Sequence, residues 1–186
     1  MERKKQVWEA LTALVIALVV LLVIDRLTNR FTGVEGHAWD TVYYIDMAEK
    51  GIVGNPNLGS PYAYRFLTPL FARAINQAFN QPTVFGFRVA AYTGLLGTLF
   101  GLYLIARHLN ARYWIAVIVM LVPATALFNV KFILFDSYRP DQFAYFCLVF
   151  ALLALMKGKI ALSILLSVIG LQTREFPIIP PLIILY

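Results

Sequence analysis

The chain alternates long apolar segments with short polar ones. Five segments are long enough to be interpreted as helical membrane spans, because a helix needs about 20 apolar residues to cross a bilayer. A sixth apolar segment starts near Pro177 and stops where the sequence ends. The pattern predicts an all-α, polytopic membrane protein with a partial last span, the N-terminal part of a longer protein. The five full spans are 7–24, 83–106, 113–131, 140–156 and 160–173.

The composition supports a membrane protein and argues against nucleic acid as a partner. Hydrophobic residues make up 60% of the chain and charged ones only 14%, against about 25% in soluble domains. The net charge of +6 does not predict nucleic-acid binding, because the basic residues separate the apolar segments instead of forming one patch. Cys147 is the only cysteine, which excludes an intrachain disulfide and a cysteine metal cluster.

The basic residues also predict which way the chain lies in its membrane. "MERKK", "RHLNAR" and "KGK" occupy alternate connections, as the positive-inside rule requires if the N-terminus is cytoplasmic. The first span lacks a small-residue cleavage motif, so we expect an uncleaved anchor. This topology places most acidic residues on the extracytoplasmic side, in a bacterial or archaeal plasma membrane or an endoplasmic-reticulum-like membrane.

The connection over residues 25–82 is the only long polar loop, and it predicts two juxtamembrane helices. The first lies in "HAWDTVYYIDMAEKG" and ends near Gly51. Asp40 is either its N-cap or a functional carboxylate. The second, in "TPLFARAINQAF", is amphipathic and suits a membrane surface. Before it, "SPYAYR" supplies Tyr64 and Arg65.

Charged residues recur at one depth in two later spans. Helical rise places Arg174 only about 22 Å from Lys159, short of the ~30 Å hydrocarbon thickness. Asp141 lies at a similar depth, with Arg139 just above it. Either the pairs Arg174–Glu175 and Arg139–Asp141 neutralise one another, or these residues line a polar cavity that opens outward. Agreement between two independent segments favours the cavity.

Three stretches resemble the N-terminal part of a known family: "WDTVYYIDMAEKG", "SPYAYRFLTPLFARAI" and "LQTREFPIIPPLI". They resemble the GT-C fold glycosyltransferases, polytopic enzymes that take a sugar from a polyprenyl-phosphate carrier. In that family an acidic residue near the start of the first loop helix is the catalytic base. Asp40, followed by Tyr44, Ala48 and Gly51, matches that pattern. Some members use a divalent metal, and Thr41 stands where many relatives have glutamate.

The resemblance implies an inverting glycosyltransferase such as a mannosyltransferase, acting on the extracytoplasmic side on a polyprenyl-phosphate-linked sugar. Asp40 would deprotonate the acceptor, and Arg139 and Arg174 would hold the lipid phosphate. The remaining candidates, which would contact substrate or orient the arginines, are Tyr64, Arg65, Asp141 and Glu175.

A non-catalytic membrane protein is the alternative: a transporter, a lipid-headgroup binder or a subunit of a protein complex. A scaffold whose outer loop only docks a partner is a third interpretation. Transport predicts polar positions near the bilayer midplane, often at broken helices. The spans mostly lack these and carry their charges on one side, which favours chemistry at the membrane surface.

Overall fold

The computed structural model describes residues 2–29, 40–55, 58–59, 62–126 and 130–185, and within them all regular structure is helical. The prediction of an all-α chain is confirmed. The elements are α1 (Glu2–Leu27), α2 (Thr41–Lys50), the 3-10 turn η1 (Tyr62–Tyr64), α3 (Leu67–Phe79), α4 (Thr83–His108), α5 (Tyr113–Thr125), α6 (Phe132–Phe135), α7 (Asp141–Met156), α8 (Ile160–Leu171), the 3-10 turn η3 (Phe176–Ile178) and α9 (Ile179–Leu185).

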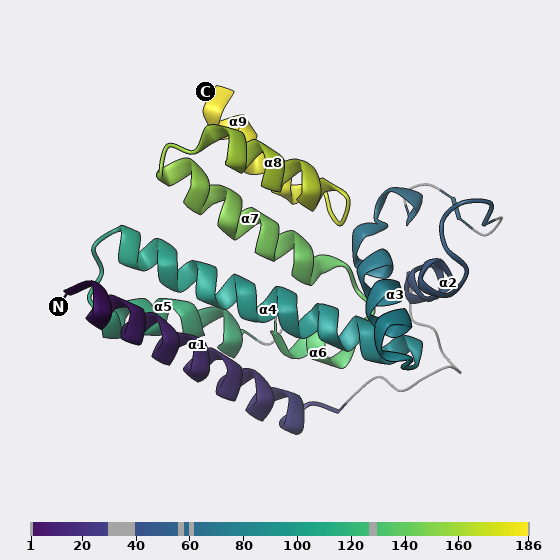
Figure 1. Cartoon of the computed structure of the whole chain (residues 1–186), viewed down its shortest axis with the longest axis horizontal. Coiled ribbons are helices and arrows are strands. Elements are labelled where there is room, and N and C mark those ends of the chain that lie inside the picture. Colours follow the sequence, from purple (N-terminus) through teal and green to yellow (C-terminus); the bar gives the residue numbers. More distant parts are fainter. Residues whose placement is uncertain (1, 30–39, 56–57, 60–61, 127–129, 186) are drawn as a thin grey trace.

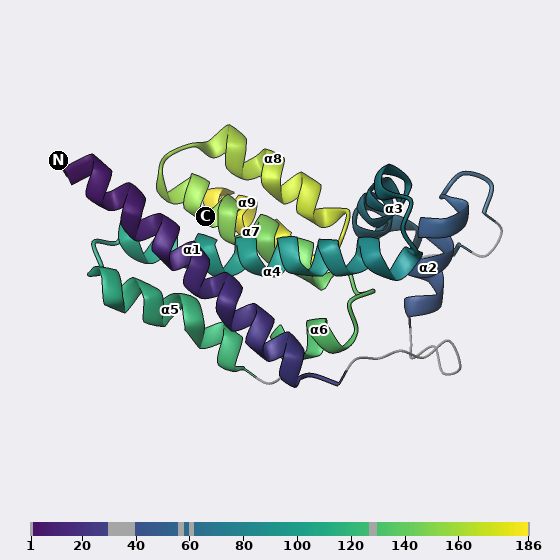
Figure 2. The same ribbon diagram turned by 60° about the horizontal axis from the view of Figure 1, so that its bottom comes forward.

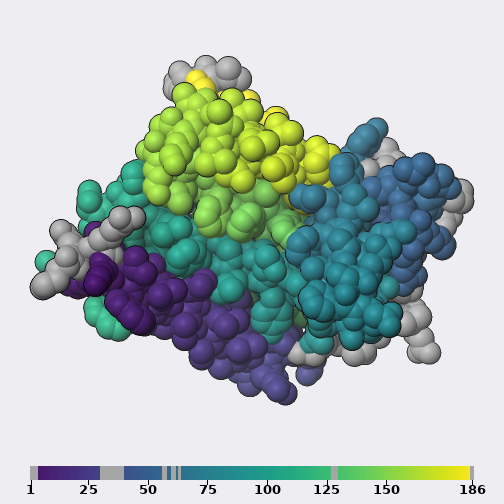
Figure 3. Space-filling model, viewed as in Figure 1, coloured from purple at the N-terminus to yellow at the C-terminus, as the bar shows by residue number. Residues whose placement is uncertain are grey.

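Five helices, α1, α4, α5, α7 and α8, form an elongated bundle with α4 at its centre (Figure 1). The small helices α2 and α3 sit together at one end, which we call the loop end (Figures 1 and 2). The start of α1 and the α4–α5 and α7–α8 turns lie at the opposite, N-terminal end. Figure 3 shows the blue and teal atoms of this region packed directly against the end of the bundle. The chain therefore gathers its polar connections at two opposite ends.

The helices follow the predicted apolar segments closely, but most are short. By length and apolar composition, only α1 and α4 could cross a membrane among the described residues. At 1.5 Å per residue, α5, α7 and α8 extend only about 18–24 Å. The predicted span 113–131 stops being α5 at Thr125, and its residues 127–129 lie outside the described part. Length and composition therefore support two spans, and the five-span arrangement stays a prediction.

The outward faces of several bundle helices are apolar and uncovered. Few residues of α1 are buried, although it is the most apolar of the long helices. Soluble monomers rarely leave contiguous apolar surface of this kind exposed. The large exposed side chains include Val15, Val19 and Val23 on α1, Ile115, Ile118 and Val122 on α5, Leu165 and Val168 on α8, and Leu182 and Ile183 on α9.

Small residues bring α4 and α7 into close contact. A Cβ added at Gly94 would lie 2.7 Å from the backbone carbonyl carbon of Gln142, and one at Gly97 would lie 2.2 Å from the ring of Phe146. Glycine at these two positions therefore lets the two helices approach closely. This contact fixes the first turn of α7, which begins at Asp141, against the central helix at the loop end.

The loop end has a small core of its own. Tyr44 and Met47 of α2 are buried with Ala72 of α3 and Phe87 of α4. Gly51 ends α2 with φ of 90°, a left-handed value that suits glycine, and its N–H donates to the carbonyl of Met47. The end of this first loop helix was predicted correctly.

The second loop helix, α3, buries one face of its first turns and exposes two of its larger apolar residues. Thr68, Pro69 and Ala72 are buried, whereas Leu70 and Phe79 are exposed. Asn76 fixes α3 to the next helix, because its side-chain oxygen accepts from the N–H of Gly86 at 2.7 Å. The helix is therefore amphipathic, and its exposed apolar side chains are available for contact with lipid.

Candidate active site

Four segments that are far apart in the sequence bring charged side chains together at the loop end. They are the start of α2, the end of η1, the link from α6 into α7, and the turn after α8. We call the resulting group the loop-end cluster; its members are Asp40, Arg65, Asp136, Arg139, Asp141, Arg174 and Glu175. Six of these seven were predicted as site residues from the sequence.

Asp40 occupies the N-cap position of α2 but does not cap it with its side chain. Its backbone carbonyl accepts from the N–H groups of Tyr43 and Tyr44, so the residue starts the helix through its main chain alone. Its Oδ2 instead lies 3.8 Å from a terminal nitrogen of Arg65, and 29% of the side chain is exposed. The carboxylate is therefore available for a role other than capping.

Arg65 links the first loop helix to the end of α8. One of its terminal nitrogens lies 2.7 Å from Oε1 of Glu175, and the other faces Asp40. The Arg65 side chain is mostly buried, whereas Glu175 is 72% exposed. A backbone bond from the N–H of Leu67 to the carbonyl of Gln172 holds the two segments together. The arginine nearest to Asp40 is thus Arg65, whereas the sequence predicted Arg139 and Arg174 as the main phosphate ligands.

Arg174 and Asp141 form a two-point ion pair between the end of α8 and the start of α7. Nε of Arg174 lies 3.0 Å from Oδ1, and a terminal nitrogen donates to Oδ2 at 3.2 Å. Both side chains are mostly buried. Paired N–H groups of a guanidinium match two oxygens of a carboxylate, and they match two oxygens of a phosphate equally well.

Arg139 and Asp136 form the third pair, in the link between α6 and α7. Nε of Arg139 lies 3.5 Å from Oδ2 of Asp136, and its guanidinium sits 4.6 Å above the ring of Phe132. Thr41 donates to the same carboxylate at 3.4 Å, which ties α2 to this link. Asp136 is almost fully buried, and this burial raises the pKa of its carboxyl group.

Aromatic rings border the cluster on the α2 side. Tyr62 stacks on Tyr43 with ring centroids 4.3 Å apart, and it meets Tyr44 edge-on at 6.4 Å. The Asp40 carboxylate raises the pKa of Tyr62, and burial raises the pKa of Tyr44, so both phenols stay protonated near neutral pH. Tyr64, the tyrosine predicted to bind substrate, stays at the surface and is 68% exposed. Tyr62 takes the place beside Asp40.

The ion pairs differ from those considered on sequence grounds. The sequence suggested Arg174 with Glu175 and Arg139 with Asp141, which are neighbours along the chain. The structure instead pairs Arg174 with Asp141 and Glu175 with Arg65, because the first turn of α7 packs beside the end of α8. Asp136 was counted only as one of the outer acids. Asp136 lies three residues before Arg139 in the sequence, and this spacing was the signal that would have placed it in the site.

The donor set does not fit a divalent metal ion. Each carboxylate of the cluster faces an arginine, and the described residues contain no group of three His, Cys, Asp or Glu side chains that could hold a metal. The arrangement suits an anion held by guanidinium groups beside a carboxylate. Comparison of the chain with protein-family models, with curated proteins and with solved structures found no match.

Proposed function

We propose that this chain is a polytopic membrane protein whose loop end faces the extracytoplasmic side. The uncovered apolar faces of α1, α5, α8 and α9 support this, because lipid is the solvent that would cover them. The exposed apolar side chains of α3 suit a helix lying on the membrane surface. The basic connections cluster at the N-terminal end, which the positive-inside rule assigns to the cytoplasm.

We further propose that the loop-end cluster transfers a sugar from a polyprenyl-phosphate carrier to a hydroxyl or amine acceptor. The single observation that supports this best is the state of Asp40. Its carboxylate makes no capping hydrogen bond to α2 and is partly exposed. It lies beside Arg65, one of the three arginines of the loop-end cluster. A base next to cations that bind phosphate is what this transfer needs.

The paired arginines suggest how the donor would enter. A phosphate would replace carboxylates as the partner of the guanidinium groups. Glu175 is the easiest to replace, because its largely exposed side chain can turn into water and release Arg65. Arg174 offers a two-point fork that the phosphate can share with or take from Asp141. The exchange costs little, since one set of charge-assisted hydrogen bonds replaces another.

In the chemical step, residues of the loop-end cluster act on the acceptor and on the departing phosphate. The acceptor oxygen or nitrogen attacks the anomeric carbon, and Asp40 takes the proton from it. The bond between the anomeric carbon and the phosphate oxygen breaks, and its electron pair leaves with the polyprenyl phosphate. The sugar is transferred with inversion. Arg65 and Arg174 stabilise the charge that grows on the departing phosphate.

The test compares Asp40→Asn with Asp46→Asn in membranes that contain the chain, supplied with a panel of radiolabelled polyprenyl-phosphate sugars. Asp46 is the matched control, because it lies on the same helix but bonds to Lys50 and Asn55, away from the cluster. Loss of a positioned general base lowers rates by roughly 10²–10⁴-fold. We expect that loss in Asp40→Asn and near-normal transfer in Asp46→Asn. Wild-type transfer by Asp40→Asn would overturn the role of Asp40 as the base, and no transfer by the unaltered chain would contradict the proposal and favour a lipid-headgroup binder.

A further inference from the structure

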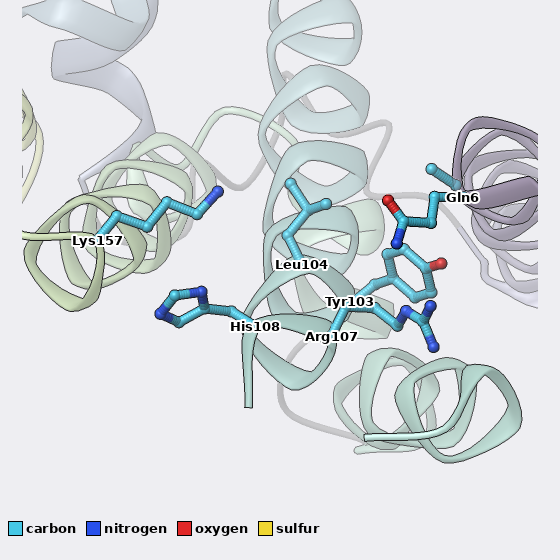
Figure 4. A pocket seen from close by; sticks show the side chains of 7 residues that line it. Gln6, Tyr103, Leu104, Arg107, His108 and Lys157 are labelled. Carbon is cyan, nitrogen blue, oxygen red and sulfur yellow. The ribbon is translucent and has the colours of Figure 1, made fainter. Parts of the chain in front are cut away.

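A polar pocket lies at the N-terminal end, opposite the loop-end cluster. It has a volume of about 270 Å³ and opens between α1 and α7 over the last turns of α4 (Figure 4). Ligand sites for drug-sized molecules are usually larger, about 300–1,000 Å³. The space therefore suits a compact group. The polar and aromatic side chains that line it are Gln6, Tyr103, Arg107, His108 and Lys157, with Leu104 at its floor.

Two donors enter this pocket from opposite walls. Lys157, which follows the last residue of α7, points toward Leu104 from one side, and Gln6 of α1 points inward from the other side (Figure 4). No carboxylate lies within ion-pair distance of Lys157 among the residues that the structure describes. A lysine ammonium and an amide N–H₂ are both hydrogen-bond donors. The pocket therefore offers hydrogen-bond donors and the positive charge of Lys157, which is in no ion pair with a carboxylate of the described residues.

The other two basic residues are already held in place. Arg107 donates to Oε2 of Glu9 at 2.9 Å and to the carbonyl of Ala111 at 3.1 Å, which fixes α1 against α4. His108 places Nε2 3.3 Å from the carbonyl of Met156, so this nitrogen carries the hydrogen in that contact. Cations near helix C-termini are common because they complement the helix dipole. That explanation covers His108 at the end of α4 and also Lys157 at the C-cap of α7, but it does not require the Lys157 side chain to point into the pocket.

We propose that this pocket binds the phosphate of an anionic phospholipid headgroup, with Lys157 as the main charge, Gln6 as a donor and His108 as part of the pocket wall. Trp8 and Trp114, at the starts of α1 and α5, are 70% and 68% exposed and lie at the same end of the bundle. Exposed tryptophans mark the headgroup level of a bilayer. Basic pockets between helices on the cytoplasmic side bind anionic headgroups of this kind. The inference rests on the proposed membrane arrangement and is independent of sugar transfer.

The experiment is native mass spectrometry of the full chain in a non-ionic detergent, titrated with phosphatidylglycerol or with phosphatidylcholine of the same acyl chains. We expect one phosphatidylglycerol to be retained in preference to phosphatidylcholine. The double variant Lys157→Gln, His108→Gln should weaken that retention about fivefold or more, the effect of losing one surface cation near anionic lipid. Lys159→Gln is the matched control, an exposed lysine two residues further along, outside the pocket lining.

Equal losses in Lys159→Gln and in the double variant would overturn the proposal, because they would show only a general preference of basic ends for anionic lipid. Displacement of the retained lipid by millimolar inorganic phosphate would overturn the lipid assignment in favour of free phosphate. Asp40→Asn should retain the lipid normally. A protein that loses sugar transfer but keeps lipid, or the reverse, therefore separates this inference from the proposed enzyme activity.

Discussion

The two ends of the bundle treat charge in opposite ways. At the loop end, three arginines each face a carboxylate, and the pairs join four separate chain segments. Among the described side chains of the N-terminal end, Arg107 is paired with an acid, while Lys157 lines the pocket without a carboxylate at ion-pair distance. An anion that enters the loop end must exchange partners with carboxylates, which selects for two-point geometry. An anion at the N-terminal end meets an available charge, which attracts many anions.

The sharpest way to break this comparison is to remove one arginine from each end. Arg65→Gln leaves Asp40 and Glu175 without their shared partner and weakens the link between the η1 segment and the end of α8, where only the backbone bond from Leu67 to Gln172 among the contacts described above remains. Displacements of about 1 Å around a catalytic group can cost 10²-fold in rate. We therefore expect sugar transfer to fall by roughly that factor. Arg107→Gln breaks a pair far from the cluster and should change transfer by less than about threefold.

Both variants are compared in the membrane transfer assay, with melting temperature as the control for folding. Equal losses of transfer at equal melting temperatures would show that the loop-end pairing has no special role. A loss in Arg65→Gln that follows a collapse of melting temperature would assign a structural role to Arg65, and Arg65→Lys would then separate charge from geometry. Lysine restores the charge but not the fork.

The second prediction concerns the central helix that connects the two ends. A methyl group at Gly94 would meet the backbone of Gln142, which cannot turn aside as a flexible side chain can. Overpacking of this kind costs about 1–3 kcal/mol, or roughly 2–12 °C in melting temperature for a chain of this size. Gly59→Ala is the control, because no atom lies within 4 Å of the added Cβ. Equal melting temperatures for Gly94→Ala and Gly59→Ala would show that α4 and α7 are less tightly packed than the structure indicates.

Much of this fold was predictable because apolar periodicity is a local signal. The segments 83–106 and 140–156 became α4 and α7 almost without change, and Gly51 ended α2 as expected. The extent of α5 was not predictable from hydropathy, since the helix stops soon after Pro123. Apolar runs give the position of a helix, whereas proline and packing decide where it ends.

The site was predictable in membership but not in pairing. Arg174 and Glu175 were both singled out, because ionisable residues in apolar segments need a reason to be there. Their partners come from α7 and from η1, and such contacts depend on how helices pack, which spacing along one helix cannot reveal. Tyr62 beside Asp40 was passed over for Tyr64 for the same reason. A three-residue turn decides which of the two faces inward.

The third prediction uses the buried acid of the cluster. Burial raises the pKa of Asp136, so its contribution to stability is full below the unfolded value near 3.9 and is lost as pH rises through the folded value. Asp136→Asn stays neutral throughout and can still accept from Thr41. The melting temperature of the variant relative to wild type should therefore rise between about pH 4 and pH 7. A difference that is flat or falls with pH would show that Arg139 stabilises the ionised carboxylate fully.

The smallest expected effect concerns Glu175, and its sign is opposite. The hydrogen bond from Arg65 lowers the pKa of this carboxyl group, so its stabilising contribution is present above the unfolded value near 4.3 and is lost as pH falls through the lower folded value. Because the side chain is 72% exposed, the contribution should not exceed about 1 kcal/mol. Wild type should thus melt slightly higher than Glu175→Gln at pH 6, and the two should converge near pH 3.

Melting-temperature differences that change with pH in opposite directions for the Asp136 and Glu175 variants would also support the proposed replacement of Glu175 by the donor phosphate on Arg65. A weakly held, exposed carboxylate on Arg65 is one that an incoming phosphate can replace, whereas a buried carboxylate on Arg139 is a fixed part of the frame. If Glu175→Gln instead lowered the melting temperature at pH 6 by more than about 4 °C, the shift for about 1 kcal/mol in a chain of this size, Glu175 would be the structural member of the cluster. Phosphate would then have to reach the arginines through Asp141 and Arg174.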